Sequence, residues 1–149
     1  MVLAFLLVPA PAFALILLSF HAAPGAVLVV GEGTANAVLN FGSVSAFEPL
    51  PLGVSRSVGS SSYTLSTTFG VRVVRLVSLS ATYTLRARLQ SAQALSWQVD
   101  GVTMSTSETT VATGQPFGLT VPHTVAFEVP FNHPAGPVTT VLEVIAIAN

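Results

Sequence analysis

The stretch Ser80–Gln90, S-A-T-Y-T-L-R-A-R-L-Q, decides the fold class of this chain. Apolar residues occupy every second position from Ala81 to Leu89, and threonine or arginine stands between them. A strand places alternate side chains on opposite faces, whereas a helix would scatter these residues around its circumference. The stretch therefore predicts a strand with one buried face and one face in water.

The chain after residue 25 continues in the same way, as short strand-like segments separated by turn residues. Leu95–Met104 predicts a hairpin, because Asp100-Gly101 can supply the positive φ angles of a two-residue type I′ turn. Gly70 is expected to mark a bend or bulge between two strands. Further strands are predicted at residues 37–41, 61–67, 71–77, 124–130 and 138–148.

About seven short strands with no helical period predict an all-β fold, an immunoglobulin-like β-sandwich forming a single domain over residues 26–149. The last strand is apolar on both faces apart from Glu143, so we expect it in the centre of its sheet. Trp97 shares the phase of Leu95 and Val99 and is therefore expected in the core, rather than on the surface as a platform for a sugar ring.

Residues 1–25 contain no Asp, Glu, Lys or Arg and predict a signal peptide. Pro9 and Pro11 would interrupt a membrane-spanning helix, and small residues that suit cleavage by a signal peptidase lie at residues 12–14 and again at residues 22–25. The second position uses the whole apolar run and is the one we expect. The usual basic start is missing, since the first basic residue is Arg56; either the α-amino group supplies the charge or the true start lies upstream. An uncleaved membrane anchor is the alternative. We expect a secreted protein, extracellular or periplasmic, at the cell surface.

The composition excludes several classes of function. Charged residues make up 7% of the chain, against roughly 25% in an average soluble protein. With a net charge of −1 and no basic patch, nucleic-acid binding is not expected. The chain has no cysteine, and so no disulfide, thiolate nucleophile or cysteine-based metal site. Low charge also offers little repulsion against self-association.

The two ends of the domain resemble secreted bacterial sandwich families. The opening segment, A-V-L-N-F-G-S-V at residues 37–44, resembles the "LNFG-x-V" first strand of several of them. The ending, from Val129-Pro130 through Pro134-Ala135-Gly136 to residues 138–144, resembles the "IP…PAG…T-x-x-V" ending of pilin-like spore coat protein U domains. This resemblance implies an exported sandwich of the kind that builds adhesive surface fibres. The chain departs from the pattern in lacking a cysteine pair and an aromatic C-terminal residue.

No group of residues predicts an enzyme, a cofactor or a metal site. His123 and His133 bracket one strand beside Glu128, which would place the two imidazoles roughly 20–30 Å apart at ~3.3 Å per residue. We expect both histidines in loops. Asp100 is the only aspartate and is needed for its turn, and no G-x-S-x-G motif is present. The glutamates show no pairing of the kind that glycosidases use.

Two surface features are candidates for binding. Arg86 and Arg88 lie on the water-facing side of one predicted strand, and Arg72 and Arg75 lie on the neighbouring segment. If those strands pair, the four arginines would form one patch for a carboxylate-bearing glycan or an acidic partner; otherwise they are solubilising charges.

The second feature is the apolar stretch Val27, Leu28, Val29 and Val30. It is either the first strand of its own sandwich, a strand that adds to the sheet of a neighbouring subunit, or part of the leader.

These observations predict an exported, non-enzymatic structural or adhesive surface protein that acts as a self-assembling, pilus-like subunit. Its expected partners are copies of itself or related surface proteins, without nucleic acid, and with membrane contact only through an uncleaved leader. The alternative is a monomeric secreted module that binds carbohydrate through the arginine face.

Overall fold

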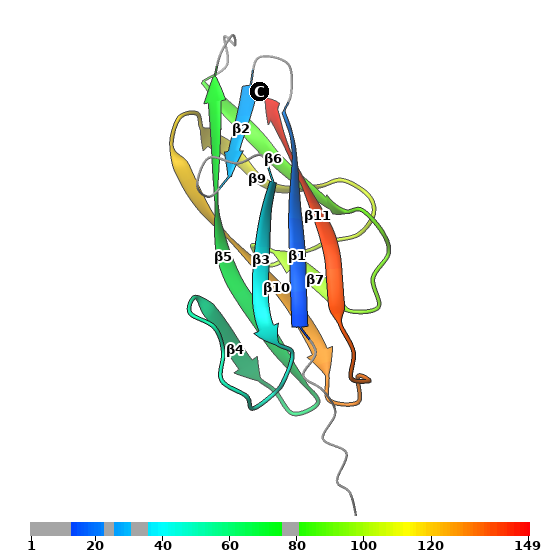
Figure 1. The fold of residues 1–149 in the computed structure, drawn as a ribbon. Helices are drawn as coiled ribbons and strands as arrows, with labels where there is room; N and C mark the ends of the chain where they lie inside the picture. Colours follow the sequence, from blue (N-terminus) through cyan, green and yellow to red (C-terminus); the bar gives the residue numbers. More distant parts are fainter. Residues whose placement is uncertain (1–12, 23–25, 31–35, 76–80) are drawn as a thin grey trace, which may run out of the picture.

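The computed structural model describes residues 13–22, 26–30, 36–75 and 81–149. These residues form eleven strands and no helix, arranged as two packed sheets in a sandwich-like architecture (Figure 1). The all-β prediction is confirmed, although the strands are more numerous than the seven expected. Within the described ranges, no helix is long and apolar enough to cross a membrane.

The first sheet has five strands, and one pair of neighbouring strands in it is parallel. Their order across the sheet is β3-β1-β11-β6-β9. β1 pairs with β11 in parallel, and the other neighbours pair antiparallel. The bounds are β1 (Phe13–Ala22), β3 (Asn36–Ser43), β6 (Thr82–Leu89), β9 (Thr109–Pro116) and β11 (Val138–Ala148).

The second sheet is antiparallel and is built around one long strand. The order is β2-β5-β10-β7-β8, and β4 also pairs with β5. β10 lies along one edge of β5, so β2 and β4 share the other edge, β2 along residues 71–75 and β4 along residues 63–67. The bounds are β2 (Ala26–Val30), β4 (Val54–Val58), β5 (Ser62–Arg75), β7 (Ser96–Val99), β8 (Val102–Thr103) and β10 (Thr120–Pro130).

The strands predicted most clearly from periodicity are confirmed. In β6 the residues Tyr83, Leu85, Ala87 and Leu89 are buried, and the residues between them are not. β11 lies between β1 and β6, which agrees with its apolar character on both faces. The predicted hairpin joins β7 to β8, and its Asp100 and Gly101 have φ angles of 49° and 79°.

The predicted break at Gly70 is wrong, because β5 runs through it as one strand. Gly70 lies opposite Pro122 of β10, with no register shift on either side. A Cβ atom at this position would lie 2.7 Å from Cγ2 of Thr120, so the glycine allows a close approach of two strands rather than a bend. The predicted strand at 71–77 ends at Arg75, and residues 76–77 lie outside the described residues.

An aromatic cluster joins the two sheets in the core. The Trp97 ring lies 4.3 Å from Phe127, and the edge of Phe41 meets Phe127 at 5.0 Å and Trp97 at 6.4 Å. All three side chains are buried, which confirms the core position of Trp97. Since such pairs contribute about 0.5–1.5 kcal/mol each beyond their buried area, the cluster holds β3 of the first sheet onto β7 and β10 of the second.

Candidate functional site

The position between β3 and β11 is the feature of this fold that bears most directly on function. β1 fills it, with Ala14–Ala22 opposite Val138–Ala146 of β11 in nine parallel pairs. On its other side β1 runs antiparallel to β3, from Ser19 opposite Asn36 to Phe13 opposite Ser43. β1 is therefore a central strand with pairing on both edges (Figure 1).

β3 belongs to its sheet only through β1. It is the outermost strand in the order β3-β1-β11-β6-β9, and no other described strand of that sheet pairs with it. If β1 were absent, β3 and β11 would each present a row of unpaired backbone donors and acceptors. Phe41 of β3, whose side chain is 0% exposed, would then be held only by packing. A strand at this position is therefore needed to complete the sandwich.

The strand that completes the sheet comes from the predicted leader. β1 spans Phe13–Ala22, which lies wholly within the residues 1–25 predicted to be removed. Cleavage near residue 25 would take away this strand and leave the sheet open between β3 and β11. The retained and the cleaved forms of the chain would thus differ in whether the sandwich is complete.

The predicted assembly strand has a place in the fold of its own chain. Ala26–Val30 forms β2, paired antiparallel with residues 71–75 of β5. β2 is the last strand in its row, so its outer edge has no strand partner within the described ranges. It is thus a short edge strand, held by five residue pairs and located directly after the predicted cleavage site.

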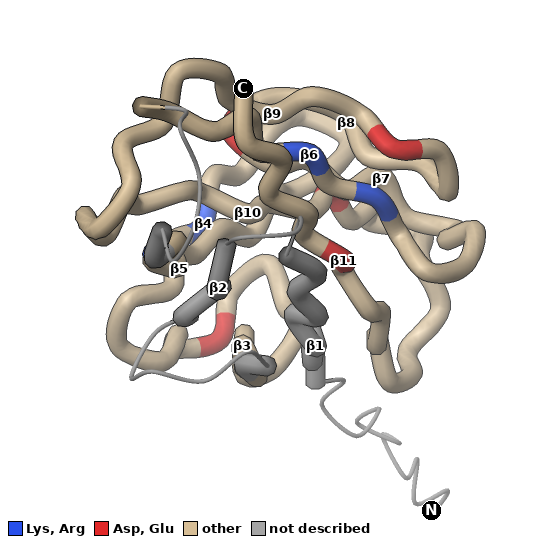
Figure 2. Tube along the Cα trace, turned by 90° about the horizontal axis from the view of Figure 1, so that it is seen from above, with Lys and Arg blue, Asp and Glu red and all other residues tan. Residues whose placement is uncertain are grey.

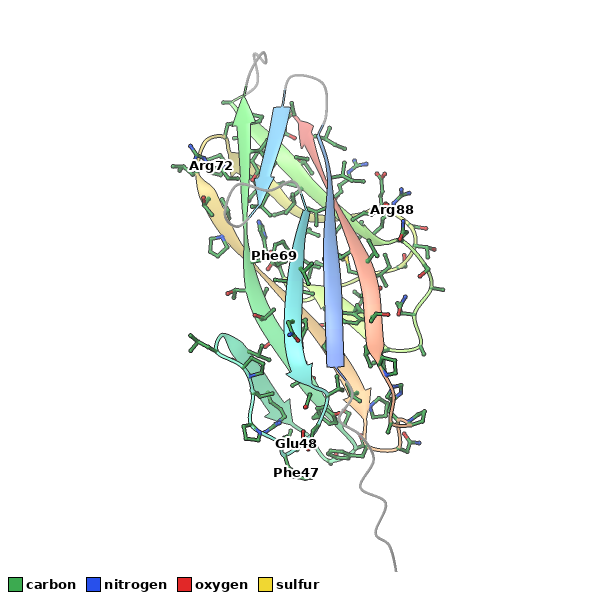
Figure 3. All side chains as sticks on the ribbon, viewed as in Figure 1. Phe47, Glu48, Phe69, Arg72 and Arg88 are labelled. Carbon is green, nitrogen blue, oxygen red and sulfur yellow. The ribbon has the colours of Figure 1, made fainter. Side chains whose placement is uncertain are left out.

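The four arginines do not form the single patch that the sequence suggested. β5, which carries Arg72 and Arg75, and β6, which carries Arg86 and Arg88, belong to different sheets and do not pair. Arg72 donates from Nε to the carbonyl of Gly118 at 3.0 Å. Figure 3 shows Arg72 and Arg88 on opposite sides of the molecule. The predicted pairing of the two segments is therefore wrong, and Arg86 and Arg88 lie on a different sheet from Arg72.

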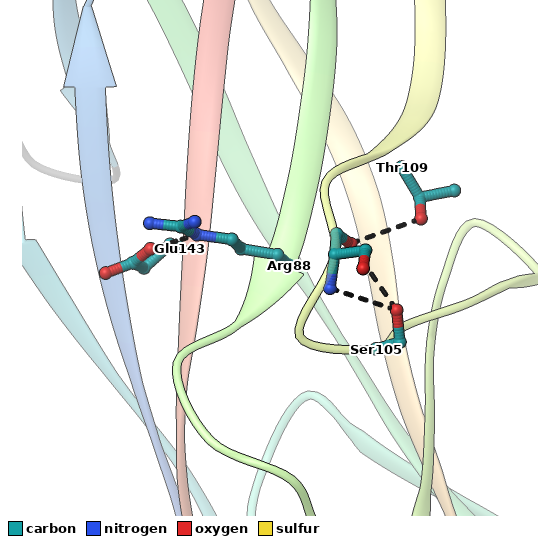
Figure 4. A network of polar contacts seen from close by, with 5 residues as sticks. Arg88, Ser105, Thr109 and Glu143 are labelled. Carbon is teal, nitrogen blue, oxygen red and sulfur yellow. Dashed lines mark hydrogen bonds and ion pairs between the residues drawn. The ribbon is translucent and has the colours of Figure 1, made fainter.

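The two arginines of β6 face carboxylates of the same chain. Arg88 Nε lies 2.5 Å from Glu143 Oε2 (Figure 4). Arg86 Nη1 lies 3.8 Å from Glu108 Oε2. Glu143 is buried, so its carboxylate needs such a partner to offset lost hydration. Figure 2 shows how few charged residues the chain carries along its trace. The face of β6 is thus close to neutral, not a concentrated positive patch.

A short turn places the partner of Arg86. The backbone N–H of Ser107 donates to Ser105 Oγ at 3.1 Å, and Thr109 Oγ1 donates to the Ser107 carbonyl at 3.4 Å (Figure 4). These contacts fix the residues on either side of Glu108, immediately before β9 begins. Glu108 therefore reaches back across the sheet to β6.

A buried histidine on a neighbouring strand contacts the turn of the β7–β8 hairpin. The prediction of a loop position for His123 is wrong: it belongs to β10 and is 3% exposed. Its Nδ1 lies 2.6 Å from Asp100 Oδ2, and its ring centroid lies 5.8 Å from that of Phe69. Asp100 Oδ1 also accepts the backbone N–H of Thr124 at 2.7 Å. The Asp100 carboxylate therefore makes two hydrogen bonds to β10, beside the bond from the backbone N–H of Asp100 to the Thr124 carbonyl.

His123 and Asp100 form a pair that sequence reasoning missed. The signal was present, because His123 is two residues before Val125 and four before Phe127, both of which point inward. His133, by contrast, lies in the loop after β10, as expected. The described part of the chain contains no group of three or more His, Cys, Asp or Glu residues able to hold a metal ion.

The chain was compared with known families and proteins. No family model matches it, and no curated protein matches it.

Proposed function

We propose that this protein is an exported, non-enzymatic structural or adhesive subunit of the cell surface, in which one copy completes the sandwich of another. The observation that supports this most directly is the origin of β1. It is a central strand of its sheet, and it comes from the segment that the sequence predicts to be cleaved. The immunoglobulin-like type of the sandwich, the signal peptide and the surface location are parts of the same proposal.

Removal of the leader would leave the edges of β3 and β11 unpaired, so that a strand from elsewhere is needed between them. Cleavage near residue 25 leaves nine residues of β11, Val138–Ala146, without a partner on that edge, and leaves β3 without a sheet neighbour. Unpaired strand edges bind other strands readily, because backbone hydrogen bonds supply affinity regardless of sequence. A strand from another copy satisfies both edges at once.

Ala26–Val30 is the strand that we propose to supply this pairing. It follows the cleavage site directly, consists of apolar and mostly β-branched residues, and occupies an edge of its own sheet. Leaving β5 costs it five residue pairs on one edge, whereas insertion between β3 and β11 gives it neighbours on both edges. Exchange between copies is therefore favoured once the position is open.

A proline variant of residues 26–149 tests this exchange. Leu28→Pro removes one backbone donor from the proposed strand, and Leu28→Thr retains it and serves as the matched control. Sedimentation velocity should show concentration-dependent oligomers for residues 26–149 and for Leu28→Thr, and a marked shift to monomer for Leu28→Pro. Equal association of both variants would show that this segment is not the strand exchanged.

The alternative function, a monomeric carbohydrate-binding module, gains no support from the arginine face. Arg86 and Arg88 are directed toward Glu108 and Glu143, so a glycan carboxylate would have to compete with acidic groups already in place. A screen of acidic glycans against the full chain tests this alternative. Binding that is lost in Arg86→Ala/Arg88→Ala would favour it over assembly.

A further inference from the structure

A row of polar residues crosses the first sheet at Glu143. Directly opposite one another along this row are Asn36 of β3, Ser19 of β1, Glu143 of β11 and Arg88 of β6. Two residues away along the strands, the corresponding positions are all apolar: Val38, Leu17 and Val141. Glu143 is the one charged residue of β11, and it lies at the register position where β1 has a serine.

Glu143 points away from the core and is nevertheless shielded from water. Its neighbours Leu142 and Val144 are buried in the core, so Glu143 lies on the opposite side of the sheet. It is only 8% exposed there. Arg88 of β6 pairs with its carboxylate on one side (Figure 4). β1 is the strand on the other side, so register position 19 lies beside a buried charge.

The order of polar and apolar residues in β1 matches this environment. Opposite the core-facing residues of β11, every β1 residue is apolar: Ala14, Ile16, Leu18, Phe20 and Ala22. The two polar residues of β1, Ser19 and His21, both belong to the alternate set. A slip of one residue would exchange the two sets, and a slip of two would place Leu17 or His21 opposite Glu143. The observed register thus puts a small hydroxyl residue opposite the buried carboxylate.

We infer that Glu143 selects which strand occupies the position between β3 and β11. It admits a strand with a hydroxyl residue opposite the carboxylate, because a hydroxyl group can donate a hydrogen bond to an ionised acceptor. An aliphatic residue at the same register position would cover the charge without offering a donor, which is costly for a buried carboxylate. Glu143 is therefore a specificity-determining residue for the strand that completes the sheet.

The same rule limits where Ala26–Val30 can pair in another copy, a consequence that rests on the proposed function. This segment of five residues contains no hydroxyl residue. Before Glu143, the position offers five residues of β11, Val138–Leu142, so the segment fits there and ends short of the carboxylate. β1 continues past Glu143 and pairs with nine residues of β11. A retained β1 should therefore hold the position against the shorter strand of another copy.

Two substitutions of nearly equal shape test the inference in the full chain. Ser19→Thr keeps the hydroxyl group, and Ser19→Val replaces it with a methyl group. Native-state hydrogen exchange of the β11 amides that bond to β1 measures how often β1 leaves its place, and the β11 amides that bond to β6 are the internal reference. The equilibrium constant for opening should be about tenfold larger in Ser19→Val than in Ser19→Thr.

Two comparisons separate Glu143 from other causes. Leu17→Thr and Leu17→Val, in the apolar row, should show no advantage for the hydroxyl group. In an Arg88→Met/Glu143→Leu background, the difference between threonine and valine at position 19 should vanish. Equal opening of the two Ser19 variants, a difference that persists in that background, or unprotected amides in the unmodified full chain would overturn the inference. The readout follows β1 within one chain, whereas the Leu28→Pro comparison follows association between copies, so the inference and the proposed function can fail separately.

Discussion

Replacement of Asp100 should show how strongly the β7–β8 hairpin depends on its contact with β10. Asp100→Ala removes both carboxylate acceptors, leaving the buried His123 Nδ1 and the more exposed Thr124 N–H without this partner. The buried group should cost about 1–3 kcal/mol and the exposed one about 0.5–1.5 kcal/mol. Placing alanine at a φ of 49° adds about 1 kcal/mol. The expected loss of unfolding free energy is thus about 3–5 kcal/mol.

Asp100→Asn is the matched control, because asparagine tolerates a positive φ and can still accept the Thr124 N–H. Its expected cost is about 1–2 kcal/mol, from loss of the charged hydrogen bond to His123. Urea unfolding followed by the fluorescence of Trp97, the chain's one tryptophan, measures both variants. Equal losses for the two variants, or losses below about 0.5 kcal/mol for Asp100→Ala, would refute the assignment of the hairpin's stability to this carboxylate.

Three further substitutions probe other contacts. Tyr83→Phe should leave stability near neutral pH unchanged or higher, because the buried hydroxyl has no hydrogen-bond partner within the described ranges. Burial raises the pKa of Tyr83, so ionising this side chain costs more in the folded state than in the unfolded state. The chain therefore loses stability as pH rises above ~10, and thermal unfolding should show a smaller alkaline loss in Tyr83→Phe. Gly70→Ala should cost about 1–2 kcal/mol in urea unfolding through its clash with Thr120, and less in a Thr120→Ser background, where the interfering methyl is absent. Arg88→Met should cost about 1–2 kcal/mol in the same assay, and a double-mutant cycle with Glu143→Leu should return a coupling of about 1 kcal/mol; additive losses would contradict a paired interaction.

Side-chain periodicity was sufficient to predict the strands that bury one face. β6, β10 and the β7–β8 hairpin follow from alternation and from the Asp-Gly turn, because these signals are local. β9 was missed because T-T-V-A-T-G-Q-P does not alternate cleanly; it is an edge strand with register shifts along its pairing with β6. Short β4 was missed for a similar reason, since within the described part of the chain it pairs with β5 alone and little of it is buried.

Features that depend on tertiary contacts were beyond the reach of the sequence. The arginine patch required β5 to pair with β6, but consecutive strands in a sandwich can belong to opposite sheets, as these do. Gly70 was predicted to mark a break because its local signal is the same for a bulge and for a close approach, and only the position of Thr120 distinguishes them. β1 was missed because an uncharged apolar segment at the N-terminus has the composition of a leader, whichever strand edges it pairs with.

Complementation by a peptide tests the central claim most directly. Residues 26–149 would be examined by light scattering coupled to size-exclusion chromatography, alone and with a synthetic peptide of residues 13–22, beside the full chain. If the position between β3 and β11 must be filled, residues 26–149 alone should form concentration-dependent oligomers. The peptide should convert them to a one-to-one monomeric complex, and the full chain should remain monomeric. A stable monomer of residues 26–149 that ignores the peptide would contradict the claim.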